Sequence, residues 1–398
     1  MKIQKSLPVI LLVGSSMLSA TAIAAGDTYS GFPVTLKGYS GDKKTSVRYS
    51  GQAARHVLHN SLKKIITSLI VIFIASTHLA IAKEVNVYSA RKEALIKPVL
   101  DVFSKETGIT VNLITGKADA LLTRLRLEGI ASPADVFITV DAGRLHRAKL
   151  AKVLQQTQSE TLKKRIPSNL RDVDNVWFGL SQRARPIFYA PDKVDPSELS
   201  TYEALADEKW RGRICMRSSN SVYNQSLVAS MMDAIGKEKT QQWLNAFVKN
   251  FKQRPAGGDT DQLKAVAAGL CDITIANTYY FGRLINSQDE SDKTVAKKLR
   301  VFWPNQQDRG THVNVSGAGI TVHAKNKENA LKLIEFLSSP ESQAWYSAVN
   351  NEYPVVKGSD ISETLKSWGE FKQDTVDLSI LGENNRSAVE LMDRADWK

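Results

Sequence analysis

Residues 271–283 read CDITIANTYYFGR, a short alternating apolar run followed by two adjacent tyrosines. Neighbouring side chains of a strand point to opposite faces, so Tyr279 and Tyr280 could not serve one site if the extended chain continued through them. On a helix, neighbouring side chains are only about 100° apart. We therefore predict that the strand breaks at Asn277, and that Asn277 or Thr278 caps a helix that opens with the two tyrosines.

From Glu84 onward the chain alternates strand and helix patterns, which is typical of an α/β protein. For example, residues 84–89 predict a strand, and residues 93–108 predict a helix that ends on Gly108. The 398 residues less the first 82 leave 316, which exceeds the usual size of one hydrophobic core. We therefore expect two α/β lobes, with a ligand bound at the carboxyl ends of strands.

Two long extended stretches are the predicted crossings between the lobes: FGLSQRARPIFYA (178–190) and VSGAGITV (315–322). Each lobe is expected to be a mixed sheet flanked by helices. The predicted boundaries are residues 83–181 plus 316–360 for the first lobe, and residues 182–315 plus 361–398 for the second.

Two segments near the N-terminus have the pattern of a secretory signal. Residues 1–25 and 61–82 each place two lysines ahead of an apolar run that ends in a small-x-small cleavage site. The second run is short and interrupted by polar residues, which favours cleavage after Ala82 over a transmembrane anchor. Two start signals suggest two starts, and a non-standard initiation at Leu62 would give a typical exported precursor.

The segment between these signals, residues 26–60, repeats Tyr-Ser-Gly at a spacing of ten residues. It resembles the N-terminal edge of an unrelated exported protein family found near bacterial iron-uptake genes, but it is too short to be that domain. We expect a fused fragment that is disordered and has no function of its own.

The formal charge of +12 at first suggests a nucleic-acid partner. Residues 1–82 hold nine of the 53 Lys and Arg but only two of the 41 Asp and Glu, so the remainder carries 44 basic and 39 acidic residues, or +5. It also lacks a basic block interleaved with aromatic residues. We therefore expect no nucleic-acid partner.

Signatures of catalysis are absent from the sequence. It contains no phosphate-cradling glycine loop, no zinc-protease motif and no nucleophile elbow. His146, His312 and His323 are scattered without the spacing of a zinc site, so we expect a protein that is not an enzyme. Cys215 and Cys271 precede tyrosine-bearing segments; an even cysteine count in an exported chain predicts a disulfide, and two buried thiols are the alternative.

Four tyrosines share a setting at strand ends or helix starts: Tyr88, Tyr223, Tyr279 and Tyr280. Phenolate oxygen is a hard, anionic ligand that suits hard, high-valent metals. Because the free phenol has a pKa of about 10, the metal must drive off its proton, as Fe(III) can, whereas Ca²⁺ and Mg²⁺ prefer carboxylates and carbonyls. Three or four phenolates also roughly neutralise a 3+ ion.

Several segments of the chain closely resemble the periplasmic ferric-iron-binding proteins of ABC importers, the transferrin-like group of bacterial solute receptors. The resemblance spans roughly Glu84 to Lys398 and implies a two-lobed fold of the class II periplasmic type, with a ligand cleft between the lobes. The segments are VYSAR (87–91), SSNSVYNQSLVAS (218–230), CDITIANTYYFGRL (271–284), GAGITVHAKNKENALKLIEFLSSPESQ (317–343) and EYPV (352–355).

The same resemblance implies that the four tyrosines named above are the metal ligands. Some members place a histidine just before the first tyrosine, where this chain has Val87, which cannot bind metal. Other relatives add a carbonate-like synergistic anion beside the metal.

Five residues could hold that anion or balance its charge. Arg91 is one candidate, although a surface salt bridge is its simpler role. Ser219, Asn220 and Ser221 precede a helix start with free N–H groups, where plain N-capping is the alternative. Arg144 could lie behind the ligands as a further positive charge, or be a solvated residue at a helix start.

The leading hypothesis is a monomeric periplasmic protein that captures Fe(III) between two lobes and delivers it to an ABC permease in the inner membrane with its ATPase. The alternative is a receptor of the same fold for an organic or oxyanion solute, in which the tyrosines stack or hydrogen-bond. Colour separates the two hypotheses, because tyrosinate bound to ferric iron gives a visible charge-transfer band.

Overall fold

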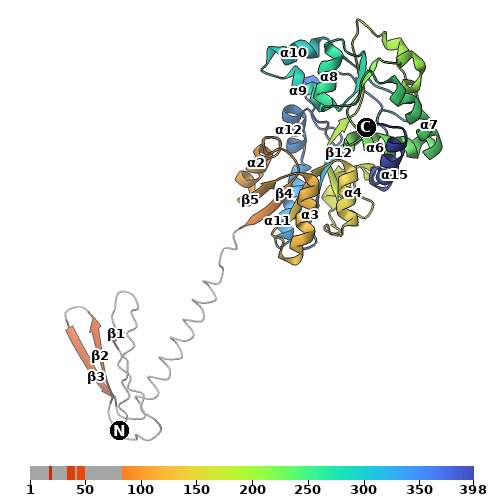
Figure 1. Ribbon diagram of the computed structural model, residues 1–398. Coiled ribbons are helices and arrows are strands. Elements are labelled where there is room, and N and C mark those ends of the chain that lie inside the picture. The colour runs from red at the N-terminus through yellow and green to blue at the C-terminus, as the bar shows by residue number, and fades with distance from the viewer. Residues whose placement is uncertain (1–17, 20–33, 41–42, 50–82) are drawn as a thin grey trace. The chain divides into compact units, whose positions relative to one another are not determined.

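The computed structural model describes residues 18–19, 34–40, 43–49 and 83–398 and comprises two units, Met1–Ile81 and Ala82–Lys398 (Figure 1). In the first unit, β2 (Val34–Ser40) pairs antiparallel with β1 (Leu18–Ser19) and with β3 (Lys43–Tyr49). Two parts of the segment 26–60, expected to be disordered, are therefore strands, and their β-branched and aromatic residues favour extended chain. The rest of that segment, Leu62 and the predicted cleavage site lie outside the described residues.

The first sheet of the larger unit has five strands in the order β5-β4-β6-β12-β7. Strand β4 runs parallel to β5 and β6, whereas β12 is antiparallel to β6 and β7, so the sheet is mixed as predicted. The strands are β4 (Glu84–Ser89), β5 (Thr110–Thr115), β6 (Val136–Val140), β7 (Phe178–Ala184) and β12 (Val313–Ile320).

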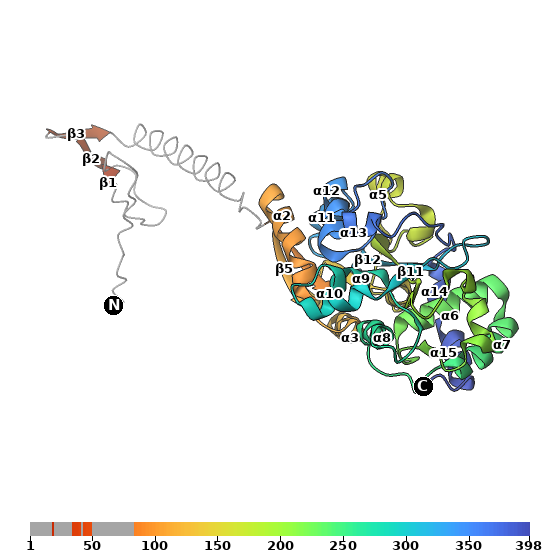
Figure 2. The ribbon, with the colours of Figure 1, turned by 90° about the horizontal axis from the view of Figure 1, so that it is seen from above.

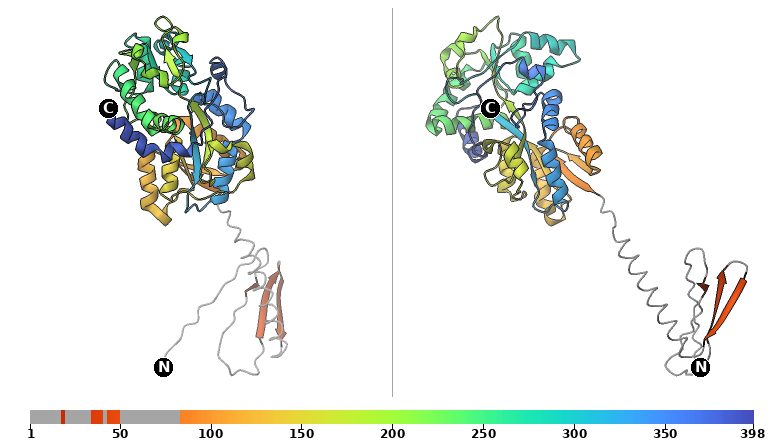
Figure 3. Two further views of the ribbon diagram at one scale, coloured as in Figure 1. Left: turned by 90° about the vertical axis from the view of Figure 1, so that its right-hand side faces the viewer. Right: turned by 180° about the vertical axis from the view of Figure 1, so that it is seen from behind.

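Helices surround this sheet and complete the first lobe (Figures 1 and 3). Helix α2 contacts α11 and β5, α3 contacts β4, α4 contacts β6 and β12, and α12 contacts β7. The helix predicted to end at Gly108 does so, with that glycine in the left-handed conformation at φ 67°. The helices are α2 (Lys97–Thr107), α3 (Ala118–Glu128), α4 (Ala142–Leu150), α5 (Glu160–Arg165), α11 (Lys327–Leu337) and α12 (Pro340–Asn350).

The second sheet has four strands in the order β11-β8-β10-β9 and forms the second lobe. Strand β8 is antiparallel to β10 and β11, while β9 is parallel to β10, so this sheet is also mixed. Buried Phe188, Leu263 and Leu284 join the helices to the sheet in one apolar cluster. The strands are β8 (Ile187–Tyr189), β9 (Ile214–Cys215), β10 (Ile273–Ile275) and β11 (Arg300–Phe302).

Helices of the second lobe and the C-terminal segment account for the remaining elements. In Figure 2, α14 and α15 lie close to α6, in agreement with the contacts of both with α6. Helix α14 also contacts α4 of the first lobe, and α15 contacts α7. The helices are α6 (Val222–Ile235), α7 (Lys237–Phe247), α8 (Asp259–Ala267), α9 (Thr278–Ile285), α10 (Glu290–Lys297), α13 (Glu363–Lys366), α14 (Ser379–Glu383) and α15 (Asn385–Arg394).

The chain passes between the two sheets inside the first predicted stretch, but it returns ahead of the second, so the prediction of a crossing at residues 315–322 is wrong. Strand β7 ends at Ala184 in the first sheet and β8 begins at Ile187 in the second, so the first crossing is Arg185-Pro186. The chain returns through residues 303–312, between β11 and β12. Every residue of β7 and β12 is buried, including polar residues of both strands such as Arg183 and Asn314, and both strands belong to the first sheet.

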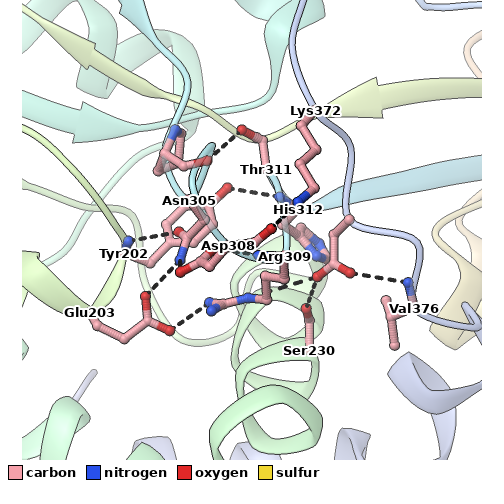
Figure 4. A network of polar contacts seen from close by, with 12 residues as sticks. Tyr202, Glu203, Ser230, Asn305, Asp308, Arg309, Thr311, His312, Lys372 and Val376 are labelled. Atoms are coloured by element: carbon pink, nitrogen blue, oxygen red, sulfur yellow. Dashed lines mark hydrogen bonds and ion pairs between the residues drawn. The ribbon is translucent and has the colours of Figure 1, made fainter.

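A polar network ties the returning segment to the second lobe and to the C-terminal segment (Figure 4). The Asn305 amide donates to Glu203 at 2.9 Å, and Arg309 forms an ion pair with Glu203 at 2.7 Å. Asp374 lies 3.9 Å from Arg309 and accepts a hydrogen bond from Ser230 at 3.4 Å. The segment between the sheets is therefore anchored by side chains and not only by its backbone.

No helix of residues 83–398 is long and apolar enough to cross a membrane.

Candidate metal centre

The two adjacent tyrosines stand at the start of helix α9, as predicted. Strand β10 ends at Ile275, Asn277 occupies the N-cap with extended backbone angles (φ −73°, ψ 140°), and α9 begins at Thr278. The phenol rings of Tyr279 and Tyr280 lie on one side of the helix, with centroids 4.4 Å apart. The predicted break at Asn277 is confirmed, and it allows both phenols to serve one site.

Tyr223 joins this pair from the first turn of α6. Burial and then the phenols of Tyr223 and Tyr280 raise the pKa of Tyr279 well above its ordinary value. Burial, Tyr223 and Asp259 likewise raise the pKa of Tyr280. Tyr223 therefore opposes the ionisation of both of its neighbours, and a cation placed among the phenols would favour their phenolate forms.

Guanidinium groups surround the three phenols. The guanidinium carbons of Arg183, Arg185 and Arg217 lie 5.7, 6.0 and 5.5 Å from the centroid of the Tyr223 ring. Arg283 lies 5.0 Å from the Tyr279 ring centroid. Arg183 is 2% exposed, and its Nε and Nη2 atoms have no hydrogen-bond partner among the described residues. The site is thus rich in positive charge before any metal enters, which favours anionic ligands and a bound anion.

Asp259, the first residue of α8, binds two of these arginines directly, while Asp141 lies 4.0 Å from Arg183. Asp259 is fully buried and accepts from Arg185 at 2.8 Å, from Arg217 at 3.2 Å and from the backbone N–H of Asn277 at 2.9 Å. Burial alone would raise the pKa of this carboxyl, but the two arginines and the N–H lower it below its ordinary value. Asp259 is therefore held as a carboxylate beside the phenols.

A disulfide joins the two segments that carry the tyrosines. Cys215 ends β9 and Cys271 precedes β10, the sulfur atoms are bonded, and the Cα atoms lie 5.8 Å apart. The two strands are also paired in parallel, with Thr274 opposite Cys215. The predicted disulfide is confirmed, and it fixes the strand that leads to α6 against the strand that leads to α9.

Tyr88, expected to share the site, does not lie in this cluster. Val85 and Val87 occupy one face of β4, so Tyr88 points to the other face, which α3 covers. Its hydroxyl is 3.0 Å from each carboxylate oxygen of Glu128, and the guanidinium of Arg124 stacks 4.8 Å from its ring centroid. The four tyrosines therefore divide into a cluster of three and a separate Tyr88.

Arg91, a candidate for the anion, is buried and already paired. Its Nη2 atom lies 2.8 Å from Glu352, and its Nη1 atom donates to Ser181 at 3.4 Å. Burial lowers the pKa of Arg91, but the nearby Glu352, Tyr346 and Tyr279 raise it by more, so the net pKa is raised above its ordinary value. Arg91 thus borders the cluster in a buried ion pair, and not in a surface salt bridge.

The other anion candidates fall into two groups. Ser221 is the N-cap of α6, and its buried hydroxyl has no hydrogen-bond partner among the described residues, so it remains available to a ligand. Ser219 accepts through its carbonyl from Gln225, and Asn220 is exposed. Arg144 follows the N-cap of α4 by three residues, and its buried Nε atom has no partner among residues 83–398.

Arg183, Arg185, Arg217 and Asp259 were not predicted as site residues. A signal for the first two was present, because both arginines of QRARP lie in an extended stretch predicted to cross between the lobes, beside the expected cleft. Asp259 and Arg217 carry no such signal, since one begins a helix and the other follows a short strand. Among the described residues, no group of three or more His, Cys, Asp or Glu side chains is arranged to hold a metal.

Comparison with known proteins places this architecture in a family. Residues 99–373 match the family model of the bacterial extracellular solute-binding proteins. Iron uptake protein A1 of Synechocystis is 50% identical over 316 residues, covering 79% of this chain and 88% of the relative.

Solved structures agree with this match. A Trichodesmium protein (IdiA, FutA), solved in complex with iron and citrate ligands, is 51% identical with a TM-score of 0.77, covering 79% of this chain and 100% of the other. A Bordetella ferric binding protein is 40% identical with a TM-score of 0.74, covering 79% and 99% of the two chains. These relatives are solute-binding proteins and not enzymes. The chain therefore belongs to the bacterial extracellular solute-binding protein family, in the branch of periplasmic ferric-iron-binding proteins that its sequence resembles.

Proposed function

We propose that this protein binds ferric iron through the phenolate oxygens of Tyr223, Tyr279 and Tyr280 and carries it to a membrane importer. The observation that carries the proposal is the convergence of buried Tyr279 and half-buried Tyr223 and Tyr280 beside four guanidinium groups. Three phenolates would balance the charge of one Fe(III), and the ion would supply the charge needed to ionise Tyr279 and Tyr280, whose pKa values are raised. Tyr88 is outside the proposed set because its hydroxyl is bonded to Glu128.

A synergistic anion fits the remaining charge of the site. The nitrogens of Arg183 that make no hydrogen bond among the described residues, although one lies 4.0 Å from Asp141, and the hydroxyl of Ser221 are the groups best suited to hold carbonate or a small carboxylate beside the metal. The likeness to a structure solved with iron and citrate supports an anion in this position. Arg91 would then act through its ion pair with Glu352 and not as the main anion contact.

Export and delivery complete the proposal. The signal-like pattern of residues 61–82 supports cleavage after Ala82, and the names of relatives, an iron uptake protein and a periplasmic Fe(3+)-binding protein, support a periplasmic role in iron uptake. We propose that the exported protein is a monomer that serves an ABC permease and its ATPase. N-terminal sequencing of the exported protein should begin near Lys83. A start elsewhere would contradict the cleavage site without affecting the metal site.

The test of iron binding is a titration of the purified chain with ferric iron, followed by visible absorption. We expect a charge-transfer band that saturates at one iron per chain and that weakens or shifts in Tyr223→Phe, Tyr279→Phe and Tyr280→Phe. Tyr189→Phe is the matched control, because Tyr189 is a buried phenol on β8 outside the cluster. A colourless protein that binds an organic or oxyanion solute instead would favour the alternative function.

A further inference from the structure

Arg185 stands at the first crossing between the two lobes. Its backbone N–H donates to the carbonyl of His312 at 3.0 Å, in the returning segment. Its carbonyl accepts from the hydroxyl of Tyr202 at 2.9 Å, and that hydroxyl in turn accepts from the N–H of His312 at 3.2 Å. The backbone of Arg185 is thus hydrogen-bonded to the second connection between the lobes. A change in the angle between the lobes would therefore move the backbone of this residue.

The side chain of Arg185 reaches both tyrosine-bearing segments. Its Nη2 atom donates to the side-chain oxygen of Asn224 at 2.6 Å, and its Nη1 atom donates to that of Asn277 at 3.0 Å and to Asp259 at 2.8 Å. The residue is 1% exposed and Asp259 is fully buried, so water does not compete for these contacts. One guanidinium therefore connects the starts of α6, α8 and α9.

Each asparagine fixes the segment that carries its neighbouring phenol. Asn224 follows Tyr223 in the chain, and its amide donates to the carbonyls of Arg217 and Ser218 at 3.0 and 3.1 Å, which holds the loop before α6. The Asn277 amide donates to the hydroxyl of Tyr279 at 3.3 Å. Asn224, the Arg185 guanidinium and Asn277 therefore form a continuous chain of hydrogen bonds from the residue next to Tyr223 to the phenol of Tyr279.

We propose that Arg185 is a positioning residue that sets the spacing of the phenols of Tyr223 and Tyr279 and couples that spacing to the crossing between the lobes. This inference rests on the proposed iron-binding function. Arginine suits the role because its planar fork can reach three acceptors at fixed angles, whereas the ammonium of lysine is a single point charge that cannot span them. Asp259 supports this role of Arg185, since its carboxylate balances the buried positive charge and accepts a hydrogen bond from the backbone N–H of Asn277.

The test variant is Arg185→Lys, which removes the planar guanidinium group but keeps the positive charge. We expect the variant to bind iron about tenfold or more weakly, in the range seen when a group that orients metal ligands is lost. We also expect a shifted charge-transfer maximum, because the phenolates would meet the ion at altered distances. A merely structural role would lower the unfolding temperature of the iron-free protein without moving the absorption maximum of the iron-loaded protein.

The matched control is Arg213→Lys, which changes an arginine of the same lobe that bonds Asp272 at 2.6 Å, away from the phenols. It should leave the absorption maximum and the iron affinity unchanged. If Arg185→Lys does not fold, Asn224→Ala provides the second variant, since it removes the link from Arg185 to α6 together with the hydrogen bonds that Asn224 donates to Arg217 and Ser218. Its absorption maximum should also shift.

The outcomes separate the two proposals. If the wild-type protein shows no charge-transfer band with ferric iron, the proposed function fails. If the wild-type protein shows the band but folded Arg185→Lys or Asn224→Ala matches it in maximum and affinity, iron binding stands and the role of Arg185 is overturned.

Discussion

Replacing Tyr88 with phenylalanine separates a ligand from a structural tyrosine. The change removes the hydrogen bond from the Tyr88 hydroxyl to Glu128, and a hydrogen bond to a charged group is worth about 1.5–3 kcal/mol. Glu128 keeps Arg124 at 2.6 Å and Ser132 at 2.7 Å, and its side chain is 22% exposed, so the carboxylate is not left unpaired. We therefore expect the low end, about 1.5 kcal/mol of unfolding free energy.

The assay combines thermal unfolding with a ferric-iron titration of Tyr88→Phe and Tyr223→Phe. A loss of this size should lower the unfolding temperature of the iron-free protein by a few degrees, about 2 °C per kcal/mol for a chain of this length. The charge-transfer band of Tyr88→Phe should match the wild type, while that of Tyr223→Phe should be weakened or shifted. A band that disappears in Tyr88→Phe but persists in Tyr223→Phe would refute the assignment of the ligands.

Three further predictions concern the frame around the site. Replacing Cys215 and Cys271 by serine opens a loop of 56 residues, so chain entropy predicts a loss of up to about 4 kcal/mol, measured by denaturant unfolding with and without reductant. Burial and nearby guanidinium groups lower the pKa of His312 to about 3, so below pH 6.5 the unfolded chain binds one proton more than the folded chain. The free energy of unfolding should therefore fall by about 2 kcal/mol from pH 7 to pH 5, and His312→Gln should remove this contribution. Gly282→Ala would place a β-carbon 2.6 Å from that of Asn351, so α9 must shift, and thermal unfolding should show a loss of about 1–3 kcal/mol. A flat pH profile, an unchanged midpoint of the serine variant, or a wild-type melt of Gly282→Ala would each contradict the corresponding argument.

Local patterns predicted the parts of the structure that depend on neighbouring residues. The break at Asn277 follows from strand and helix periodicity together with capping chemistry, and it is present. The disulfide follows from an even cysteine count and from the shared setting of Cys215 and Cys271. The two mixed sheets follow from the alternation of strand and helix patterns.

The structure gives Tyr88 a different environment from the other three tyrosines, which the sequence did not indicate because a strand end alone does not say which face a side chain occupies. Val85 and Val87 define one buried face of β4, so the parity of Tyr88 was readable, but the sequence does not say which face borders the second lobe. The role of Arg185 depends on Asp259, 74 residues away in the chain, and on the fold that joins them. Such long-range pairs leave no local pattern.

The most direct measurement of the central claim is a crystal structure of the chain loaded with ferric iron. The account predicts one iron ion within coordinating distance of the hydroxyl oxygens of Tyr223, Tyr279 and Tyr280, with the hydroxyl of Tyr88 still bonded to Glu128. Iron bound elsewhere, or held by carboxylates with the three phenols protonated and apart from it, would contradict the account.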